Sequence, residues 1–325
     1  MNAFLMQLPL FMLLIFKCII KGLKPIKLLK ADYGLKNGGI GEVSKHFDYQ
    51  QFNKNYFLKH IFLERNISTN EKIKKIESFT KYPLVVKPDN GRTGKGVLIA
   101  KNRKELKYYL QKSELDIIAQ VYSSKKEYGV FYYKLNNKGA IYSINSKELP
   151  YVIGDGKSSV RQLIEKEHNH IKEFIPPNIN QNYVAKRGEK FKVSYIGNHS
   201  HGAIFRDATH LSTQKLLQSI EKSIGNAGFN YGRFDVVCDN DKTLKEGKIK
   251  IIEVNGVHSF STNFLDPKYS LIDAYKIINK QYNILLKVAL ENKHKPMKLP
   301  TLINFIKLTR SSESSIEKIN KTMRS

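Results

Sequence analysis

Short apolar runs separated by polar turns dominate the middle of the chain. Runs typical of strands occur at 83–88, 97–100, 117–122, 128–135, 140–145, 191–196, 232–237 and 249–255. Helical spacing of apolar residues predicts helices at 102–110, 159–164, 212–226 and 271–291. The pattern therefore predicts a mixed chain in which helices and strands alternate irregularly.

The amino-terminal segment has a different pattern. Met1 to Phe16 carries no charged side chain, and five lysines follow, namely Lys17, Lys21, Lys24, Lys27 and Lys30. An apolar run beside clustered lysines suits an interfacial helix or a short anchor at an anionic membrane surface. A spanning helix needs roughly 20 apolar residues, and Pro9 would kink this one. A secretory signal is disfavoured, because no charge precedes the run and no small-residue cleavage site follows it. A buried helix is an equally good interpretation.

Composition adds a strong positive charge. The 325 residues are enough for about two domains, and 55 Lys plus Arg against 29 Asp plus Glu give a net charge of +26. Such a charge suits nucleic acid, an anionic membrane or phosphorylated ligands. The lysines are dispersed, however, and no arginine-rich tract, aromatic RNA-binding motif or zinc-finger spacing accompanies them, so no specific nucleic acid is expected. The two distant cysteines, Cys18 and Cys238, fit a reducing compartment and support neither a disulfide framework nor a Cys-based metal site.

Polar side chains interrupt the strands expected at 232–237 and 249–255. Because side chains alternate along a strand, Arg233 and Asp235 share one face of the first, and Glu253 and Asn255 share one face of the second. The polar stretch 238–247 predicts a hairpin that would let all four converge. Two carboxylates and an amide oxygen suit Mg²⁺, and an arginine could neutralise a phosphoryl group. A solvated hairpin face with an incidental ion pair is the alternative interpretation.

A glycine-rich loop joins the strands expected at 83–88 and 97–100. Gly91, Gly94 and Gly96 allow backbone N–H groups to approach phosphate oxygens, and Lys87 and Lys95 add compact cations. A strand follows the loop, whereas a Walker A motif leads into a helix. A tight hairpin is the alternative, but a lysine within an apolar strand needs a partner if it is buried.

Other polar positions are candidate ligand contacts. The end of the strand at 117–122 could pair an adenine ring through backbone groups, and Glu127 could accept from ribose hydroxyls. His199 and His201 lack further residues that would complete a tetrahedral zinc set, so a substrate contact and a plain polar loop are both retained there. The candidate substrate-binding residues are Asn198, His201, Arg206, His258 and Ser259.

In their joint order these motifs resemble those of the ATP-grasp superfamily, in particular the carboxylate–amine ligases that include D-alanine:D-alanine ligase, cyanophycin synthetase and glutathione-forming relatives. The resemblance rests on Val85-Val86-Lys87-Pro88 with its glycine loop, on 117–122 followed by Glu127, and on Gly232-Arg233-Phe234-Asp235 followed by Ile252-Glu253-Val254-Asn255. Residues 152–164 are similar to the cyanophycin-synthetase branch. The apolar start with 37–45 is similar to a branch of bacterial ATP-grasp proteins that begin with an apolar segment.

The resemblance implies an α+β ATP-grasp fold with two α+β subdomains that enclose the nucleotide. It implies that Arg233 stabilises the transferring phosphoryl group and the later tetrahedral intermediate. Asp235, Glu253 and Asn255 would bind Mg²⁺, with Mn²⁺ as an alternative. Contacts to ATP are implied for Lys87, Gly91, Arg92, Gly94, Lys95, Gly96, Gln120, Val121, Tyr122 and Glu127.

The implied reaction is ATP- and Mg²⁺-dependent formation of an amide or peptide bond through an acylphosphate, from small-molecule carboxylate and amine substrates. A membrane-associated ATP-binding module with little or no ligase activity is the alternative. Residues 256–260 lack the Pro-Gly loop of D-alanine:D-alanine ligases, so the amino-acid specificity of those enzymes cannot be carried over.

We expect four segments: an apolar and basic start at 1–36, a region of uncertain fold at 37–80, an ATP-grasp domain at 81–292 and a basic, poorly ordered tail at 293–325. We expect the protein in the cytoplasm, and association of its amino terminus with the inner face of the membrane is the alternative to a buried amino-terminal helix.

Overall fold

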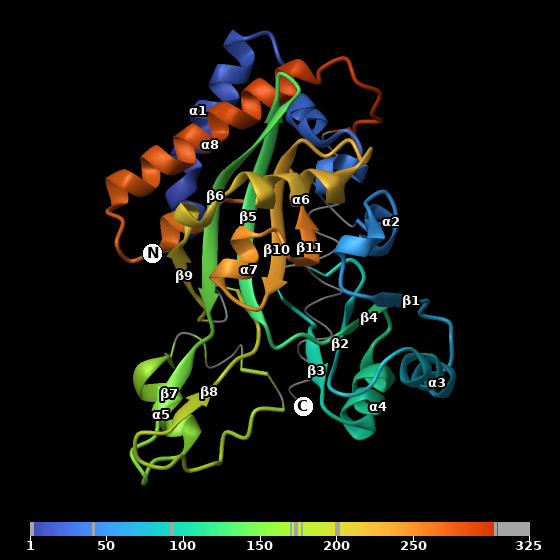
Figure 1. The fold of residues 1–325 in the computed structure, drawn as a ribbon, viewed down its shortest axis with the longest axis vertical. Helices are drawn as coiled ribbons and strands as arrows, with labels where there is room; N and C mark the ends of the chain where they lie inside the picture. The colour runs from blue at the N-terminus through green and yellow to red at the C-terminus, as the bar shows by residue number, and fades with distance from the viewer. Residues whose placement is uncertain are drawn as a thin grey trace. The chain divides into compact units, whose positions relative to one another are not determined.

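The computed structural model describes residues 3–40, 43–91, 94–169, 171, 175–176, 178–198, 202–301 and 304. The described residues form two compact units, each assembled from separate stretches of chain. Unit 1 takes its residues from 1–58, 125–146 and 205–311, and unit 2 from 59–124, 147–204 and 312–325. Figure 1 shows the helices and strands of both units.

A five-stranded sheet forms the centre of unit 1, in the order β11-β10-β5-β6-β9. The strands are β5 (Lys126–Leu135), β6 (Lys138–Glu148), β9 (Ile204–Asp207), β10 (Tyr231–Cys238) and β11 (Lys250–Asn255). β10 pairs antiparallel with both β5 and β11, which confirms the predicted hairpin. Its connection contains the short helix α7 (Asp241–Lys245), which begins at a capping box between Asn240 and Thr243.

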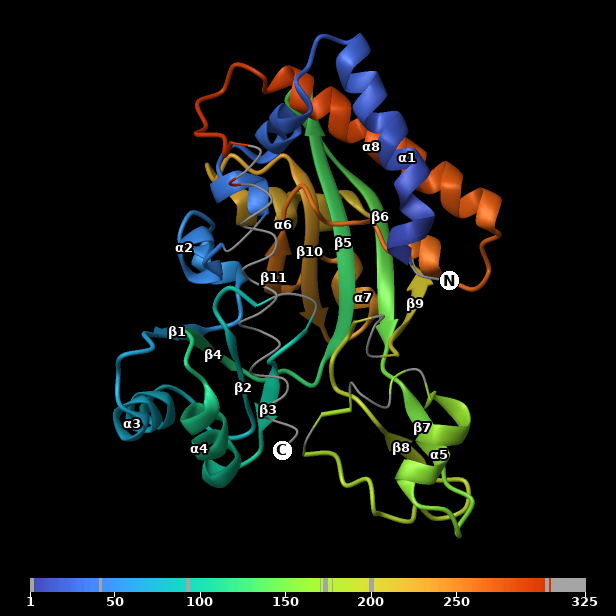
Figure 2. The ribbon, with the colours of Figure 1, turned by 180° about the vertical axis from the view of Figure 1, so that it is seen from behind.

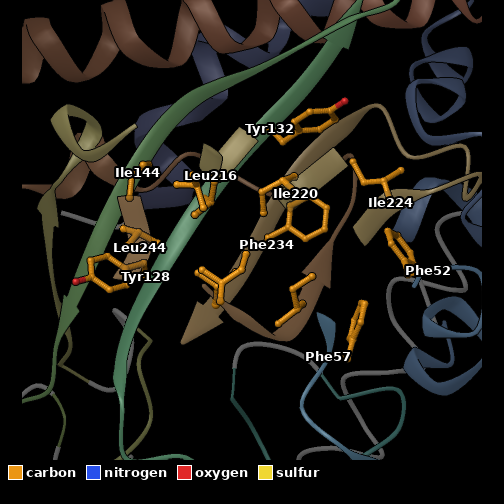
Figure 3. Close-up of a cluster of buried hydrophobic side chains, with 14 of the residues drawn as sticks. Phe52, Phe57, Tyr128, Tyr132, Ile144, Leu216, Ile220, Ile224, Phe234 and Leu244 are labelled. Carbon is orange, nitrogen blue, oxygen red and sulfur yellow. The ribbon is translucent and has the colours of Figure 1, made fainter. Parts of the chain in front are cut away.

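One face of this sheet is covered by helix α6 (Gln214–Ile224) and by α7. Alternate side chains of β5 and β10 point to this face and are buried among apolar side chains of the helices. Figure 3 shows Phe234 of β10 beside Ile220 of α6, with Phe52 and Phe57 at the edge of the cluster. Helix α6 ends at Gly225, whose φ of 53° favours glycine.

The opposite face of the sheet is apolar at one end and polar at the other. Phe131 and Tyr231 lie at the apolar end, with ring centroids 5.0 Å apart, in a cluster that includes helices α8 (Leu271–Glu291) and α1 (Ala3–Ile20). Both helices were predicted in outline, and the predicted range of α8 is matched to the residue because Ser270 caps its start. The polar end carries Arg233 and Asp235, which follow Tyr231 on the same face of β10.

Short helices complete unit 1: η1 (Pro25–Asp32), η2 (Lys36–Gly39), α2 (Lys45–Tyr49), η3 (Lys54–Tyr56), η6 (Thr209–Leu211) and η7 (Asn263–Leu265). Asp32, at the end of η1, is fully buried, and its Oδ1 accepts the backbone N–H groups of Asn230 and Tyr231, each at 2.8 Å. Burial raises the pKa of the Asp32 carboxyl well above its ordinary value, against the lowering effect of these two hydrogen bonds. Asp32 therefore joins η1 to the start of β10.

A four-stranded antiparallel sheet, in the order β1-β4-β2-β3, forms one part of unit 2. Its strands are β1 (His60–Leu63), β2 (Leu84–Pro88), β3 (Leu98–Ala100) and β4 (Ile117–Val121). Helices α3 (Thr69–Phe79) and α4 (Arg103–Lys112) pack Ile73, Ile76, Leu106 and Tyr109 into its core. As predicted, α4 begins at Asn102, whose side chain accepts the N–H of Glu105.

The remainder of unit 2 contains β7 (Tyr151–Ile153), helix α5 (Val160–Glu167) and β8 (Lys190–Lys192). The strand predicted at 191–196 is therefore too long, because its partner β7 has only three residues. The Asn178 side chain connects this region to β3 and α4: it donates to Ile99 O and Glu105 Oε2, both at 2.9 Å, and accepts from the Tyr195 hydroxyl at 2.9 Å.

The predicted α+β class is confirmed by these helices and largely antiparallel sheets. The predicted segment boundaries stay predictions. Among the described helices, none is both long enough and apolar enough to cross a membrane.

Candidate active site

Strands β10 and β11 bring four predicted site residues together in unit 1. In their antiparallel register Arg233 lies opposite Asn255, and Asp235 lies opposite Glu253. Residues that are directly opposite, or two apart along a strand, share a face of a sheet. The predicted convergence of the four side chains is therefore observed, while their roles stay predictions.

Asp235 holds the guanidinium of Arg233 in a fixed orientation. Arg233 Nε donates to Asp235 Oδ1 at 3.0 Å, and Nη2 donates to Oδ2 at 3.3 Å. Arg233 Nη1 donates to the carbonyl oxygen of Phe260 at 3.1 Å, and Asn255 Nδ2 donates to Asp235 Oδ2 at 3.0 Å. The side chains of Arg233 and Asp235 are only 18% and 8% exposed. A planar fork held at three nitrogens is oriented more rigidly than a flexible ammonium.

Carboxylates surround this arginine. Burial lowers the pKa of the Arg233 guanidinium, but Asp235, Glu253 and Glu127 outweigh that effect and raise the pKa above its ordinary value. Lys45 Nζ lies 3.5 Å from Glu253 Oε1. The three carboxylates of this cluster outnumber its two cations, so a further cation would balance the charge.

The donor set fits a hard cation. Asp235 and Glu253 provide carboxylate oxygens from directly opposite positions, and Asn255 provides an amide oxygen on the same face. Among the residues that the structure describes, no three His, Cys, Asp or Glu side chains are grouped so that they could hold a metal. A cation here would therefore bind to two carboxylates and an amide, with water or phosphate oxygens completing its coordination.

Gly129 and Asn145 extend the polar face, although sequence analysis singled out neither. Asp235 of β10 lies opposite Gly129 of β5, which lies opposite Asn145 of β6. A Cβ at Gly129 would overlap Asn145 Oδ1 and lie 3.0 Å from Arg233 Cδ, so glycine lets these two side chains approach across the strand. The alternation of Ser143 and Asn145 with the buried Ile144 was the available signal.

The loop after Asn255 is tied to the same face. The Ser259 hydroxyl donates to the carbonyl oxygens of Asn255 at 3.0 Å and Gly256 at 2.7 Å. Gln281 of α8 donates to Ser259 O at 3.1 Å and accepts the Ser261 N–H at 3.0 Å. Thr262 donates to Asn145 Oδ1 at 2.9 Å. The loop therefore rests on α8 and β6, next to the carbonyl of Phe260 that holds Arg233.

The other predicted substrate contacts are scattered. His258 is exposed, and Arg206 Nη1 lies 3.8 Å from Asp266 Oδ1 in the same unit. Asn198 belongs to unit 2, where its backbone N–H donates to Ile196 O at 2.9 Å. His201 lies outside the described residues.

Unit 2 brings together two of the predicted nucleotide contacts. Lys87 of β2 is 6% exposed, and its Nζ donates to Gln120 Oε1 of the neighbouring strand β4 at 3.1 Å. The expectation that a buried lysine needs a partner is confirmed. Val121 and Tyr122 follow directly, and the Val121 N–H is bonded to Lys59 O at 3.0 Å. The Gln120 amide thus fixes the ammonium on this sheet.

The glycine loop also belongs to unit 2. Gly94 and Gly96 have φ angles of 74° and 71°, which side-chain-bearing residues rarely adopt. Gly91 and Lys95 are described beside them, whereas Arg92 lies outside the described residues. The Tyr109 hydroxyl of α4 donates to Gly96 O at 2.8 Å and fixes the end of the loop. Glu127, by contrast, lies in unit 1 on β5, opposite Val237.

Three comparisons with known proteins bear on this arrangement. Residues 59–130 match the model of the RimK-like ATP-grasp domain. No curated protein sequence matches the chain.

Among solved structures, the chain is similar to D-alanine–D-alanine ligase from Bacillus anthracis, with 15% identity over 77% of this chain and 66% of that one, and a TM-score of 0.44. It is similar to the VanG D-Ala:D-Ser ligase from Enterococcus faecalis, with 15% identity over 74% and 61%, and a TM-score of 0.42. It is also similar to a bifunctional glutathione synthetase from Pasteurella multocida, with 16% identity over 74% of this chain and 36% of that one, and a TM-score of 0.37. The chain thus spans less than two thirds of the length of these proteins, and TM-scores this low do not establish a shared fold.

The family match starts at β1, passes through Lys87, the glycine loop and Gln120, and ends within β5 after Glu127. It covers the first two of the three motif groups on which the predicted resemblance rests. Residues 59–130 are therefore similar to a RimK-like ATP-grasp domain, and the predicted resemblance to the ATP-grasp superfamily is confirmed.

Proposed function

We propose that the protein is an ATP- and Mg²⁺-dependent carboxylate–amine ligase that forms an amide or peptide bond. The observation that carries the proposal is the array of Arg233, Asp235, Glu253 and Asn255 on one face of paired strands. The array lies in a chain whose residues 59–130 match an ATP-grasp domain. Fixed charges of both signs at one point suit phosphoryl transfer, in which positioning and electrostatic stabilisation provide most of the catalysis.

In this proposal Asp235, Glu253 and the Asn255 amide oxygen hold Mg²⁺, with Mn²⁺ as an alternative. The ion, when bound, neutralises charge on the phosphate oxygens. Arg233 stabilises the transferring phosphoryl group, and Asp235 keeps its guanidinium in position. In unit 2, Lys87 and the loop with Gly91, Arg92, Gly94, Lys95 and Gly96 bind the nucleotide phosphates. Gln120 to Tyr122 line the adenine, and Glu127 accepts from the ribose.

The proposed reaction has two steps. A carboxylate oxygen of the first substrate attacks the γ-phosphorus of ATP, the bond from that phosphorus to the β–γ bridging oxygen breaks, and ADP leaves. The amine of the second substrate then attacks the acyl carbon, the carbon–oxygen bond to phosphate breaks, and the amine loses a proton to solvent. The phosphate that leaves carries one oxygen of the original carboxylate.

Oxygen transfer provides the test. Purified protein is incubated with ATP, Mg²⁺, a pool of ¹⁸O-labelled amino acids and a pool of peptide or amine acceptors. Acceptor-dependent release of phosphate that contains ¹⁸O, with a new amide in the mass spectrum, is expected. Phosphate release that needs no carboxylate, or phosphate that contains no ¹⁸O, would refute the acylphosphate mechanism.

Matched variants separate the proposed site from general surface charge. Asp235→Asn and Glu253→Gln should abolish turnover. Glu246→Gln should leave it unchanged, since Glu246 pairs with Lys248 at 2.7 Å and is not part of the array. An ATP-binding module without ligase activity is the alternative. It gains if the unaltered protein binds ATP, the Asp235 and Glu253 variants do not, and no substrate panel gives turnover.

On location, we propose that the protein works in a reducing compartment such as the cytoplasm. Cys18 and Cys238 are both unpaired and buried, and burial raises the pKa of each thiol. Both thiols are therefore held in the protonated, unreactive form that suits small core residues.

A further inference from the structure

Helix α1 carries apolar side chains around most of its circumference, and its described side chains are buried on one side only. Leu14 and Cys18 are 2% and 0% exposed and pack in the cluster that contains α8. Among the described side chains of α1, the exposed large apolar ones are Leu8, Phe11, Met12, Leu13, Phe16, Ile19 and Ile20, with exposed fractions from 39% to 64%. At about 100° per residue these positions occupy a continuous arc of roughly 200°. We call this arc the outer face of α1.

The orientation of α1 on unit 1 is held by specific contacts. Lys17 Nζ donates to Asn279 Oδ1 at 3.2 Å and to Asn283 Oδ1 at 2.8 Å, both on α8. The Phe11 ring centroid lies 6.5 Å from that of Tyr282. Figures 1 and 2 both show α1 lying against α8. The helix therefore lies along the surface of its unit, with Phe11 at the edge of the outer face next to α8 and the rest of that face turned away from α8.

The outer face is an unusual concentration of exposed apolar surface. It contains seven of the fifteen exposed large hydrophobic side chains found in the described residues. The others are single residues or pairs on several elements. Scattered apolar residues are normal on a protein surface, whereas a contiguous patch of this kind marks a binding surface.

Positive charge follows the outer face directly. Lys21 and Lys24 are exposed just after α1. Lys30 Nζ donates to the carbonyl oxygens of Lys293 and Lys295 at 3.0 and 2.8 Å, and both of these lysines are exposed. Lys295 Nζ lies 5.5 Å from the centre of the Tyr33 ring. No aspartate or glutamate occurs before Asp32, and Asp32 is fully buried. This surface is therefore apolar along α1 and positively charged just after the end of the helix.

We propose that the outer face of α1 lies in the headgroup layer of an anionic lipid bilayer and attaches the protein to that surface. The apolar arc enters the boundary between headgroups and acyl chains, and Lys21, Lys24 and Lys293 contact the anionic headgroups. A helix with one buried side and one exposed apolar side has the geometry of interfacial attachment. The surface is independent of the proposed ligase chemistry, because it uses none of the residues assigned to that chemistry.

The absence of tryptophan from the sequence permits a direct test. Phe16→Trp places a single tryptophan on the outer face, and Phe47→Trp is a matched control in unit 1, since the two phenylalanines are 59% and 61% exposed. With vesicles of equal parts phosphatidylglycerol and phosphatidylcholine, the Phe16→Trp emission should shift to shorter wavelength and be quenched by brominated acyl chains. The Phe47→Trp emission should not change. No shift for Phe16→Trp, or equal shifts for both variants, overturns the proposal.

Flotation of the full chain with the same vesicles measures the affinity. The triple variant Met12→Ser, Phe16→Ser and Ile19→Ser should lose flotation, whereas Ile153→Ser with Val184→Ser removes exposed apolar side chains from unit 2 and should float like the unaltered protein. Lys21→Gln with Lys24→Gln should weaken binding about 25-fold, since each lysine near an anionic surface contributes roughly fivefold. If the triple variant floats normally, the bilayer is not the partner. The bilayer is also excluded if the unaltered protein does not float but is a dimer, and the triple variant is a monomer.

Discussion

Arg233 and Asp235 should be energetically coupled. Variants of this ion pair should distinguish its contribution to stability from its contribution to catalysis. Asp235→Asn leaves the Arg233 guanidinium without its carboxylate, and Arg233→Met leaves Asp235 without its cation. Two hydrogen bonds with charged partners, at 3.0 and 3.3 Å, join them, and their side chains are 18% and 8% exposed. Breaking one partner of a buried pair costs about 3–5 kcal/mol. The residual exposure places each single variant near the lower end, at about 3 kcal/mol.

The double variant removes both charges of the pair together, so it should lose about 3 kcal/mol in total, half of the sum of the single losses. Hydrogen exchange of the β10 and β11 backbone amides measures this locally, because exchange reports the free energy of opening. The double variant should still lack ATP turnover. As a control, Asp239→Asn breaks the surface pair with Lys125, at 2.9 Å and with side chains 59% and 52% exposed, and should change stability by less than about 1 kcal/mol. Additive losses for the two single variants would refute the coupling.

Three further predictions concern other parts of the fold. Because the folded pKa of Asp32 is raised by burial, its contribution to the free energy of unfolding is fully present below the unfolded value of about 3.9 and is lost as the pH rises through the folded value. Asp32→Asn should abolish that decline in urea unfolding between pH 4 and 8, and a pH-independent difference from the unaltered protein would contradict it. Gly129→Ala should lower kcat of the proposed reaction at least about tenfold, since the methyl group displaces Arg233 or Asn145, and an unchanged kcat would show that their close approach is unimportant. Asn178→Ala removes two donated hydrogen bonds and one accepted bond and should weaken unit 2 by about 1–3 kcal/mol, seen as faster hydrogen exchange at 98–100 but not in β10.

Local patterns were sufficient to predict most helices and strands. The range of α8 follows from the cap at Ser270 and from apolar residues at helical spacing, which are properties of one segment. The strands that carry Lys87 and Arg233 were predicted for a similar reason, since an apolar run with one polar interruption is visible without any partner.

Features that depend on register could not be predicted in this way. Gly129 and Asn145 matter because β5 and β6 place them beside Asp235, and no property of either segment alone specifies that alignment. Similarly, the strand expected at 191–196 stops after Lys192, because its length is limited by β7 and not by its own apolar residues. Gln120 was predicted as an adenine contact, but its bond to Lys87 appears only when β2 and β4 are paired.

The contact between α1 and α8 also has a consequence for synthesis of the chain. α1 ends at Ile20 and α8 starts at Leu271, so about 250 residues are made between a helix and the surface that covers its buried side. At about 5–20 residues per second, the apolar side chains around Leu14 and Cys18 leave the ribosome roughly 12–50 s before α8 does. During that time the side of α1 that α8 later covers is available to chaperones or to a nearby bilayer.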